Sequence, residues 1–282
     1  MLHDPSHYEP PPIAEEIRLS KRDVDVLRRL AGELAAIAAL PVHREKARLW
    51  QKLNDLESER PMVWINEVPW HEMDVNGELA LVTEHPWARD QERELRRTLY
   101  QWRHIPGDMV VSPYTSRLPG DQFDAARVRT QNMWGCSNAQ IFSEVSPQMH
   151  WEFALKHDLR WLSRWGLTYY GCCEPLDRKI DILRQIPNLR KISVSPWCDT
   201  AGVVAKIGRD YVISRKPSPA ILAEDRWRPE RARQDLREFL DAAGYPLAGH
   251  CHVELIMKDI STVRCQPQRL WEWARMAAEV VE

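Results

Sequence analysis

Two adjacent cysteines stand in the stretch LTYYGCCEPLD, residues 167–177, between an apolar run and a proline. A cysteine thiolate is both a nucleophile and a metal ligand, so a pair at the end of a strand is a candidate for chemistry. Where Pro175 stops the strand, the chain can turn both thiols to the same side. We therefore expect either a zinc site or a metal-free pair of reduced thiols at Cys172 and Cys173, because a disulfide between neighbouring cysteines is strained.

Other candidate ligands and acid-base groups also end apolar runs. Glu144 lies toward the end of the run before the cysteines, and Asp259 at the end of the last strand or Cys265 beyond it can supply a third zinc ligand. Catalytic zinc accepts such thiolate and carboxylate ligands and keeps one position open. Glu144 and Glu174 are also candidate acid-base residues, as is His71 in VPWHEM, for which a structural hydrogen bond is the alternative.

Charged and aromatic residues at the same kind of position predict a substrate site. Arg215 and Lys216 end the penultimate run and can hold a carboxylate or phosphate, Arg215 through a bidentate fork. Salt bridges from them to Asp259 or Glu174 are the alternative. The expected substrate-binding residues are Asn66, Glu67, Trp70, Arg215, Lys216, Lys258 and Asp259.

Seven short apolar runs position these residues, and helical patterns separate most of them. The runs cover residues 62–70, 108–114, 139–147, 167–175, 190–199, 210–219 and 253–262. Parallel strands need crossovers of about a dozen residues, so strands that alternate with helices predict an α/β fold with a parallel sheet. Repeated around a full turn, this alternation gives a (βα) barrel, whose reactive residues sit at the carboxyl ends of the strands.

The amino-terminal region has a different pattern. Residues 1–19 are rich in proline and polar residues and are expected to form a flexible arm. From Ser20, an N-cap candidate, apolar residues recur at helical spacing and predict helices over residues 20–57. We expect residues 20–282 to form one barrel domain that includes this helical segment.

Composition excludes several classes of protein. The 282 residues carry a net charge of −2 with both signs interspersed, which does not favour binding to nucleic acid. No apolar run approaches the roughly 20 residues that span a bilayer, and no signal peptide is recognisable. The six cysteines lack regular disulfide spacing and are expected to be reduced. The sequence therefore predicts a cytoplasmic protein that binds neither membranes nor nucleic acid.

The order of the run-end motifs resembles a known family. AQIFSEVSPQMHWEFALKHDLRWL, YYGCCEPLDRKIDILRQIPNLRKISVSPWCD, DYVISRKPSPAIL and LIMKDISTVRCQPQRLWEW are similar to the uroporphyrinogen decarboxylase superfamily. The similarity is to the decarboxylase-like branch related to zinc-dependent methyltransferases that act with corrinoid proteins, and it spans about residues 20–282. It implies a barrel enzyme that uses zinc to transfer a methyl group between a small donor or acceptor and a corrinoid protein.

The chain departs from that family in several places. The family's His-x-Cys motif at the fifth strand reads Tyr170-Gly171-Cys172-Cys173 here, and Cys265 lies several residues later than the family's distal cysteine. The arginine-rich start of the true decarboxylases is missing from MVWINEVPWHEM, which disfavours a porphyrinogen substrate.

The interval between the second and third runs is also short. Only 24 residues separate residue 114 from residue 139, too few for another strand and its helix. We therefore expect a TIM-type barrel shortened by one strand-helix unit, with open strand edges that pair irregularly or are covered in a homodimer. Two alternatives stay open: a non-catalytic relative that serves as a binding or assembly subunit, and a metal-independent decarboxylase or lyase.

Overall fold

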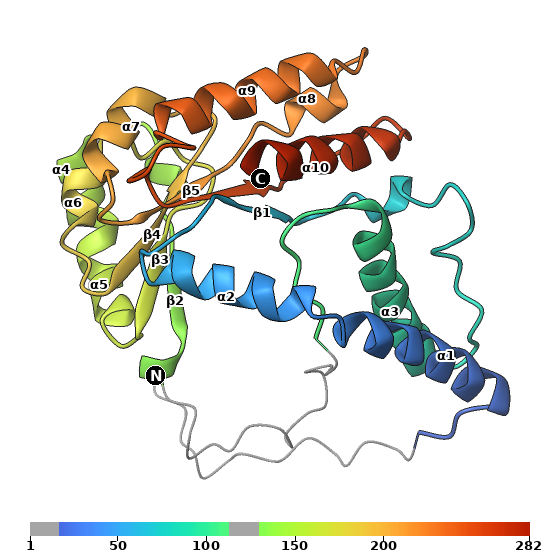
Figure 1. Cartoon of the computed structure of the whole chain (residues 1–282). Helices are drawn as coiled ribbons and strands as arrows, with labels where there is room; N and C mark the ends of the chain where they lie inside the picture. The colour runs from blue at the N-terminus through green and yellow to red at the C-terminus, as the bar shows by residue number, and fades with distance from the viewer. Residues whose placement is uncertain (1–16, 113–129) are drawn as a thin grey trace, which may run out of the picture.

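The computed structural model describes residues 17–112 and 130–282, and every statement below concerns these residues (Figure 1). Its centre is a six-stranded sheet in the order β1-β6-β5-β4-β3-β2, with every neighbouring pair parallel. The predicted parallel α/β fold is confirmed. The strands are β1 (Met62–Ile65), β2 (Trp134–Ser137), β3 (Leu167–Tyr170), β4 (Leu189–Val194), β5 (Val212–Arg215) and β6 (Val253–Met257).

Helices precede the sheet and connect its strands. Ser20 caps the first of them, since its hydroxyl oxygen accepts a hydrogen bond from the N–H of Asp23 (3.1 Å), and the predicted amino-terminal helices are confirmed. Most of the expected arm, residues 1–19, lies outside the described residues. The helices are α1 (Lys21–Ala38), α2 (Val42–Asn54), α3 (Pro86–His104), α4 (Pro147–His150), α5 (Lys156–Leu162), α6 (Ile180–Leu183), α7 (Thr200–Ile207), α8 (Ala220–Ala223), α9 (Pro229–Ala242) and α10 (Gln268–Val281).

Several single turns complete the connections. A π-helical turn, η5, joins α4 to α5, and three 3-10 turns, η2, η3 and η4, lie in the loops. Their bounds are η2 (Trp70–Glu72), η3 (Thr130–Asn132), η4 (Gln140–Phe142) and η5 (Trp151–Leu155).

Two of the runs predicted as strands are not strands. Residues 139–147 contain η4 and the start of α4, where the Ser146 hydroxyl accepts a hydrogen bond from the N–H of Met149 (3.2 Å) and Pro147 begins the helix. Serine caps a helix start and proline needs no donor there, so this pair begins a helix. Residues 108–112 form no strand either, and residues 113 and 114 lie outside the described part.

The main core lies on one face of the sheet, beneath the helices. Side chains that alternate along the strands, including Val63, Ile192 and Leu255, are fully buried against apolar residues of α7, α9 and α10. Figure 1 shows α9 and α10 side by side over this face, with α2 on the other side of β1. We call the helix-covered side the outer face.

The opposite face is covered only in part. Leu49 and Leu53 of α2 pack on Met62 and Val212, which lie toward the amino ends of β1 and β5. A second pair of helices, α1 and α3, packs mainly against each other, through residues such as Leu34 and Leu99. Among the described helices, α2 therefore covers the amino half of this face but not its carboxyl half.

Asp108 and Gln101 cap the free edge of β1, where a neighbouring strand would otherwise pair. Asp108 forms hydrogen bonds with both the N–H and the carbonyl of Val63. The backbone N–H of Asp108 donates to the Val63 carbonyl (2.8 Å), and the Asp108 carboxylate accepts from the Val63 N–H (2.7 Å). The Gln101 amide donates to the Ile65 carbonyl (3.0 Å). These contacts satisfy the backbone of an edge strand without a second chain.

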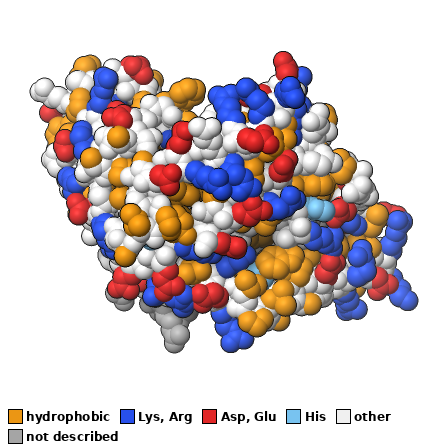
Figure 2. Space-filling view, turned by 45° about the horizontal axis from the view of Figure 1, so that its top comes forward, with side chains coloured by type: hydrophobic (Ala, Val, Ile, Leu, Met, Phe, Trp, Pro, Cys, Tyr) orange, Lys and Arg blue, Asp and Glu red, His pale blue; other side chains and the backbone are white. Residues whose placement is uncertain are grey.

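The described ranges hold no helix long and apolar enough to cross a membrane. Figure 2 shows acidic and basic side chains interspersed over the face drawn, with hydrophobic side chains in smaller groups between them. This face therefore has no extended field of one sign.

Candidate active site

The carboxyl ends of β3 and β6 meet at four side chains, which we call the thiol–lysine cluster: Cys172, Cys173, Lys258 and Asp259. The two sulfur atoms lie 3.6 Å apart, and the Cys173 thiol donates to a carboxylate oxygen of Asp259 (2.7 Å). The Lys258 ammonium donates to the Cys172 sulfur (3.1 Å) and lies 3.2 Å from the same oxygen of Asp259. One cation therefore bridges a sulfur and a carboxylate.

These contacts require a curved sheet. Strands β3 and β6 are separated by β4 and β5, three strand spacings or about 14 Å in a flat sheet. Side chains that stand upright on a flat sheet cannot close that distance to 3 Å. The sheet therefore bends toward the face that carries the cluster, and we call this the concave face.

The charges in the cluster follow from its contacts. Burial, followed by the hydrogen bonds to Asp259 and Cys172, raises the pKa of Cys173 to about 12. Burial lowers the pKa of Lys258, but its contacts with Cys172 and Asp259 raise it more, so the net shift is upward. Burial raises the pKa of Asp259, yet its hydrogen bonds and Lys258 leave it below its usual value. Cys173 thus keeps its proton while Lys258 and Asp259 are charged.

Two residues with left-handed backbone, Glu67 and Asp259, connect the carboxyl end of β1 to the cluster. Glu67 and Asp259 have φ of 51° and 56°, values that residues other than glycine rarely adopt. The Glu67 carboxylate accepts a hydrogen bond from the N–H of Asp259 (2.9 Å) and so holds both turns together. Strained backbone of this kind concentrates at functional sites, which makes Glu67 part of the candidate site.

Glu174 supports the turn that carries the cysteines. It is 3 % exposed, and its carboxylate accepts from the N–H groups of Cys172 (2.8 Å) and Ala139 (3.3 Å). The Ser193 hydroxyl fixes the same turn by donating to the Cys172 carbonyl (2.5 Å). The structure thus places Glu174 as a positioning residue beneath the thiols.

The remaining candidate acid-base residues and Cys265 lie elsewhere. Glu144 lines a separate pocket of about 450 Å³ with Lys179, Trp197 and Pro175. The side chain of His71 is 71 % exposed, beside Glu72. Glu72 in turn accepts hydrogen bonds from Thr262 and from the backbone of Val263 and Cys265, and Cys265 is exposed.

Arg215 and Lys216 point to opposite faces of the sheet, contrary to the expectation that both face the substrate. The Arg215 guanidinium lies over the Phe239 ring of α9 (4.9 Å) and donates to the Ser195 carbonyl (2.7 Å), within the outer helix layer. Lys216 donates to the Ser214 hydroxyl (2.5 Å) on the concave face. The alternation of side chains along a strand separates such neighbours.

The two other expected substrate residues flank β1. Asn66 is exposed, and its N–H continues the ladder by donating to the Met257 carbonyl (2.8 Å). Trp70 packs on α3, with its ring edge-to-face with Tyr100 (5.9 Å between centroids) and under the Arg97 guanidinium (5.1 Å). Neither side chain is held by the thiol–lysine cluster.

The four expected zinc ligands do not converge. Glu144 and Cys265 have the other surroundings described above, and Lys258 lies between the Cys172 sulfur and Asp259. Across residues 17–112 and 130–282, no group of three or more His, Cys, Asp or Glu side chains is arranged to hold a metal ion. A zinc ion at this cluster would have to replace the Lys258 ammonium beside the Cys172 sulfur.

Sequence reasoning missed a buried ion pair on the concave face. Lys191 of β4 donates to Glu254 of β6 (2.6 Å), and their side chains are 13 % and 3 % exposed. The signal was present, because RKISV and VELIM place a charged residue inside an apolar strand.

Comparison with known proteins adds nothing to this geometry: no family model and no curated protein matches the chain.

Proposed function

We propose that the chain is an enzyme of the uroporphyrinogen decarboxylase-like barrel class, and that it acts as a metal-independent decarboxylase or lyase at the thiol–lysine cluster. One observation carries this proposal. The Lys258 ammonium contacts both Cys172 and Asp259 beside a second thiol, Cys173, which hydrogen-bonds the same carboxylate. A fixed positive charge next to a proton donor suits a reaction in which negative charge develops on carbon.

Two features of the sheet support a barrel. Strand β1 pairs with the last strand, β6, and the other strands follow in chain order, as in a barrel opened between β1 and β2. The contact between the ends of β3 and β6 requires strong curvature toward one face. The chemistry then falls at the carboxyl ends of the strands, where barrels of this kind place it.

The proposed step is the loss of carbon dioxide from a small carboxylic acid. The bond between the carboxylate carbon and its neighbour breaks, carbon dioxide leaves, and the electron pair stays on the neighbouring carbon. Lys258 stabilises that negative charge, and the thiol of Cys173 donates its proton to the carbon. The thiolate left on Cys173 then regains a proton from water, and Asp259 holds the thiol in place between turnovers.

The test is release of carbon dioxide from a panel of small carboxylic acids by chelator-treated protein. Lys258→Met and Cys173→Ser should each abolish release, whereas Cys265→Ser, a matched change of an exposed cysteine outside the cluster, should not. Activity that chelation removes and zinc restores would overturn the metal-independent mechanism. Activity that survives both Lys258→Met and Cys173→Ser would place the reaction elsewhere.

A second candidate is zinc-dependent methyl transfer with a corrinoid protein, the function that the sequence resemblance implies. The spacing of the thiols favours it, because 3.6 Å is close to the roughly 3.8 Å between two sulfurs that share one tetrahedral zinc. Zinc would have to displace Lys258 and use Asp259 in place of Glu144 and Cys265.

Metal analysis separates the two candidates. The second predicts about one zinc per chain in the wild type, lost in Cys172→Ser and in Cys173→Ser and kept in Cys265→Ser. Wild-type protein that contains no zinc, even after incubation with it, would eliminate this candidate and leave the lyase.

A further inference from the structure

A polar network crosses the concave face below the thiol–lysine cluster. The Glu254 carboxylate accepts hydrogen bonds from Lys191 (2.6 Å) and from the Ser214 hydroxyl (2.6 Å). Lys216 completes the network, because its ammonium donates to the Ser214 hydroxyl (2.5 Å) and to the Ser214 carbonyl (3.1 Å). The network thus joins β4, β5 and β6.

The positive charge of this network exceeds its negative charge. Lys191 is paired with Glu254, but the acceptors of Lys216 are both neutral oxygens of Ser214, and no described carboxylate bonds to its ammonium. Lys216 is only 5 % exposed. A buried charge without a counterion is costly, so this position favours an anionic ligand.

Aromatic rings surround the two lysines. The Lys191 ammonium lies over the rings of Trp50 (5.4 Å) and Trp134 (5.3 Å), and that of Lys216 lies over Tyr169 (5.3 Å). Trp64 of β1 shares the concave face, since it lies two residues from Met62, the register partner of Glu254. Both edge strands, β1 and β2, therefore carry a tryptophan on this face.

Among the described residues, side chains on the carboxyl half of the concave face are partly exposed to solvent. Trp64, which the register places level with Lys216, and Tyr169 are half-buried, whereas Val63 and Ile192 on the outer face are fully buried. Helix α2 packs only toward the amino end of the face. A ligand can therefore reach the rings and the lysines from the edge that carries the thiols.

We propose that the concave face binds a small organic anion with a flat, apolar body, such as an aromatic carboxylate. The carboxylate pairs with Lys216, and the flat body packs against Trp64 and Tyr169, the two rings nearest to Lys216 in the register and contacts of this face. This inference names the substrate class for the proposed function, and it rests on that function only for its link to catalysis, because binding needs no reactive thiol.

Calorimetric titration of the full chain with 2-naphthoate tests the proposal. We expect one site per chain, and the neutral analogue 2-naphthalenemethanol should bind about tenfold to a hundredfold more weakly, as expected for the loss of a charged hydrogen bond. Lys216→Met should weaken 2-naphthoate by the same factor. Lys46→Met is the matched control, because the Lys46 ammonium also lies over a ring, that of Trp102, and Lys46 is half-buried outside the concave face.

Two results would overturn the proposal. One is equal affinity of the wild type for the acid and the neutral alcohol, which needs no variant to fold. The other is equal affinity of Lys216→Met and wild type for 2-naphthoate. A Cys172→Ser/Cys173→Ser double variant should still bind 2-naphthoate. Binding without carbon dioxide release therefore counts against the proposed function alone, and release without binding counts against this inference alone.

Discussion

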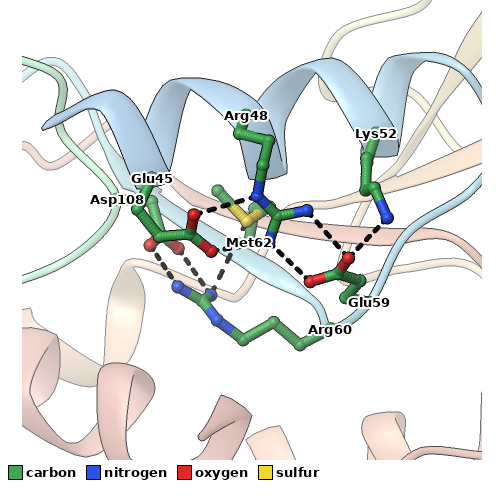
Figure 3. Close-up of polar contacts among 7 residues, drawn as sticks. All are labelled: Glu45, Arg48, Lys52, Glu59, Arg60, Met62 and Asp108. Atoms are coloured by element: carbon green, nitrogen blue, oxygen red, sulfur yellow. Dashed lines mark hydrogen bonds and ion pairs between the residues drawn. The ribbon is translucent and has the colours of Figure 1, made fainter. Parts of the chain in front are cut away.

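Replacement of Asp108 by alanine should destabilise the fold through the open edge of β1. The Asp108 carboxylate forms a bidentate pair with Arg60 (2.7 and 3.0 Å) (Figure 3). It also accepts a hydrogen bond from the N–H of Val63 (2.7 Å). The Asp108 side chain is 5 % exposed and that of Arg60 is 22 % exposed. The substitution leaves a mostly buried guanidinium and a buried N–H group without their acceptor.

The magnitude follows from these two losses. Removal of one partner from a buried ion pair costs about 3–5 kcal/mol, and an unsatisfied N–H group costs about 1–3 kcal/mol. Water reaches Arg60 and recovers part of this, so we expect about 3–4 kcal/mol in total. At about 2.1 cal/mol/K per residue, the 282 residues have an unfolding entropy of about 0.6 kcal/mol/K. The midpoint of thermal unfolding should then fall by about 5–7 °C.

The assay is thermal unfolding followed by circular dichroism, combined with hydrogen exchange at the Val63 amide. The Asp108→Ala variant should lower the midpoint and speed exchange at Val63. Glu45→Ala is the control, because Glu45 pairs with Arg48 while both side chains are exposed, and such pairs stabilise little. If Asp108→Ala lowers the midpoint no more than Glu45→Ala, the edge cap contributes nothing and the reasoning is refuted.

Two further predictions concern titrating groups. Cys173 should react with iodoacetamide more slowly than the exposed Cys265 at pH 8, because burial and then Asp259 raise the pKa of Cys173 to about 12 and leave little thiolate. The Asp259→Asn variant should speed the reaction of Cys173. Equal rates for Cys173 and Cys265, measured by peptide mass spectrometry, would contradict this prediction. Burial lowers the pKa of His150 from 6.5 to about 4, so the unfolded chain binds more protons between these values and stability falls as the pH falls from about 6.5 toward 4. His150→Gln should make the urea midpoint less sensitive to pH in this window, and an unchanged pH dependence would count against this role.

The sequence predicted the sheet where the strands are apolar runs, and missed it at β2, one of its two edges. Five of the seven runs contain β1, β3, β4, β5 and β6. Strand β2 escaped because its residues WGCS are not an apolar run, and Trp134 and Cys136 face partly into solvent. Gly135 lets this strand lie against Trp165, since a Cβ there would come within 2.2 Å of the indole. Such a tertiary fit is not visible in local periodicity.

The candidate site was predictable in place but not in orientation. The rule that reactive groups follow parallel strands brought Cys172, Cys173, Lys258 and Asp259 to one edge, and these four side chains do meet. The same rule grouped Arg215 with them, although the two-residue alternation turns its side chain into the helix layer. Distances between strands that are not neighbours depend on curvature, which no local pattern of residues encodes.

The edge cap and the candidate site are mechanically linked through β1. Asp108 holds Val63 at one end of this short strand, and Glu67, just beyond its other end, accepts the N–H of Asp259 in the cluster. Within the sheet, β1 pairs with β6 alone, and β6 leads directly into Lys258 and Asp259. Loss of the cap therefore frees one side of β1 and weakens the hold on Asp259 from the other. Because Asp259 keeps the Cys173 thiol bonded, the reactivity of Cys173 should report disorder at the edge of β1 before the outer core unfolds.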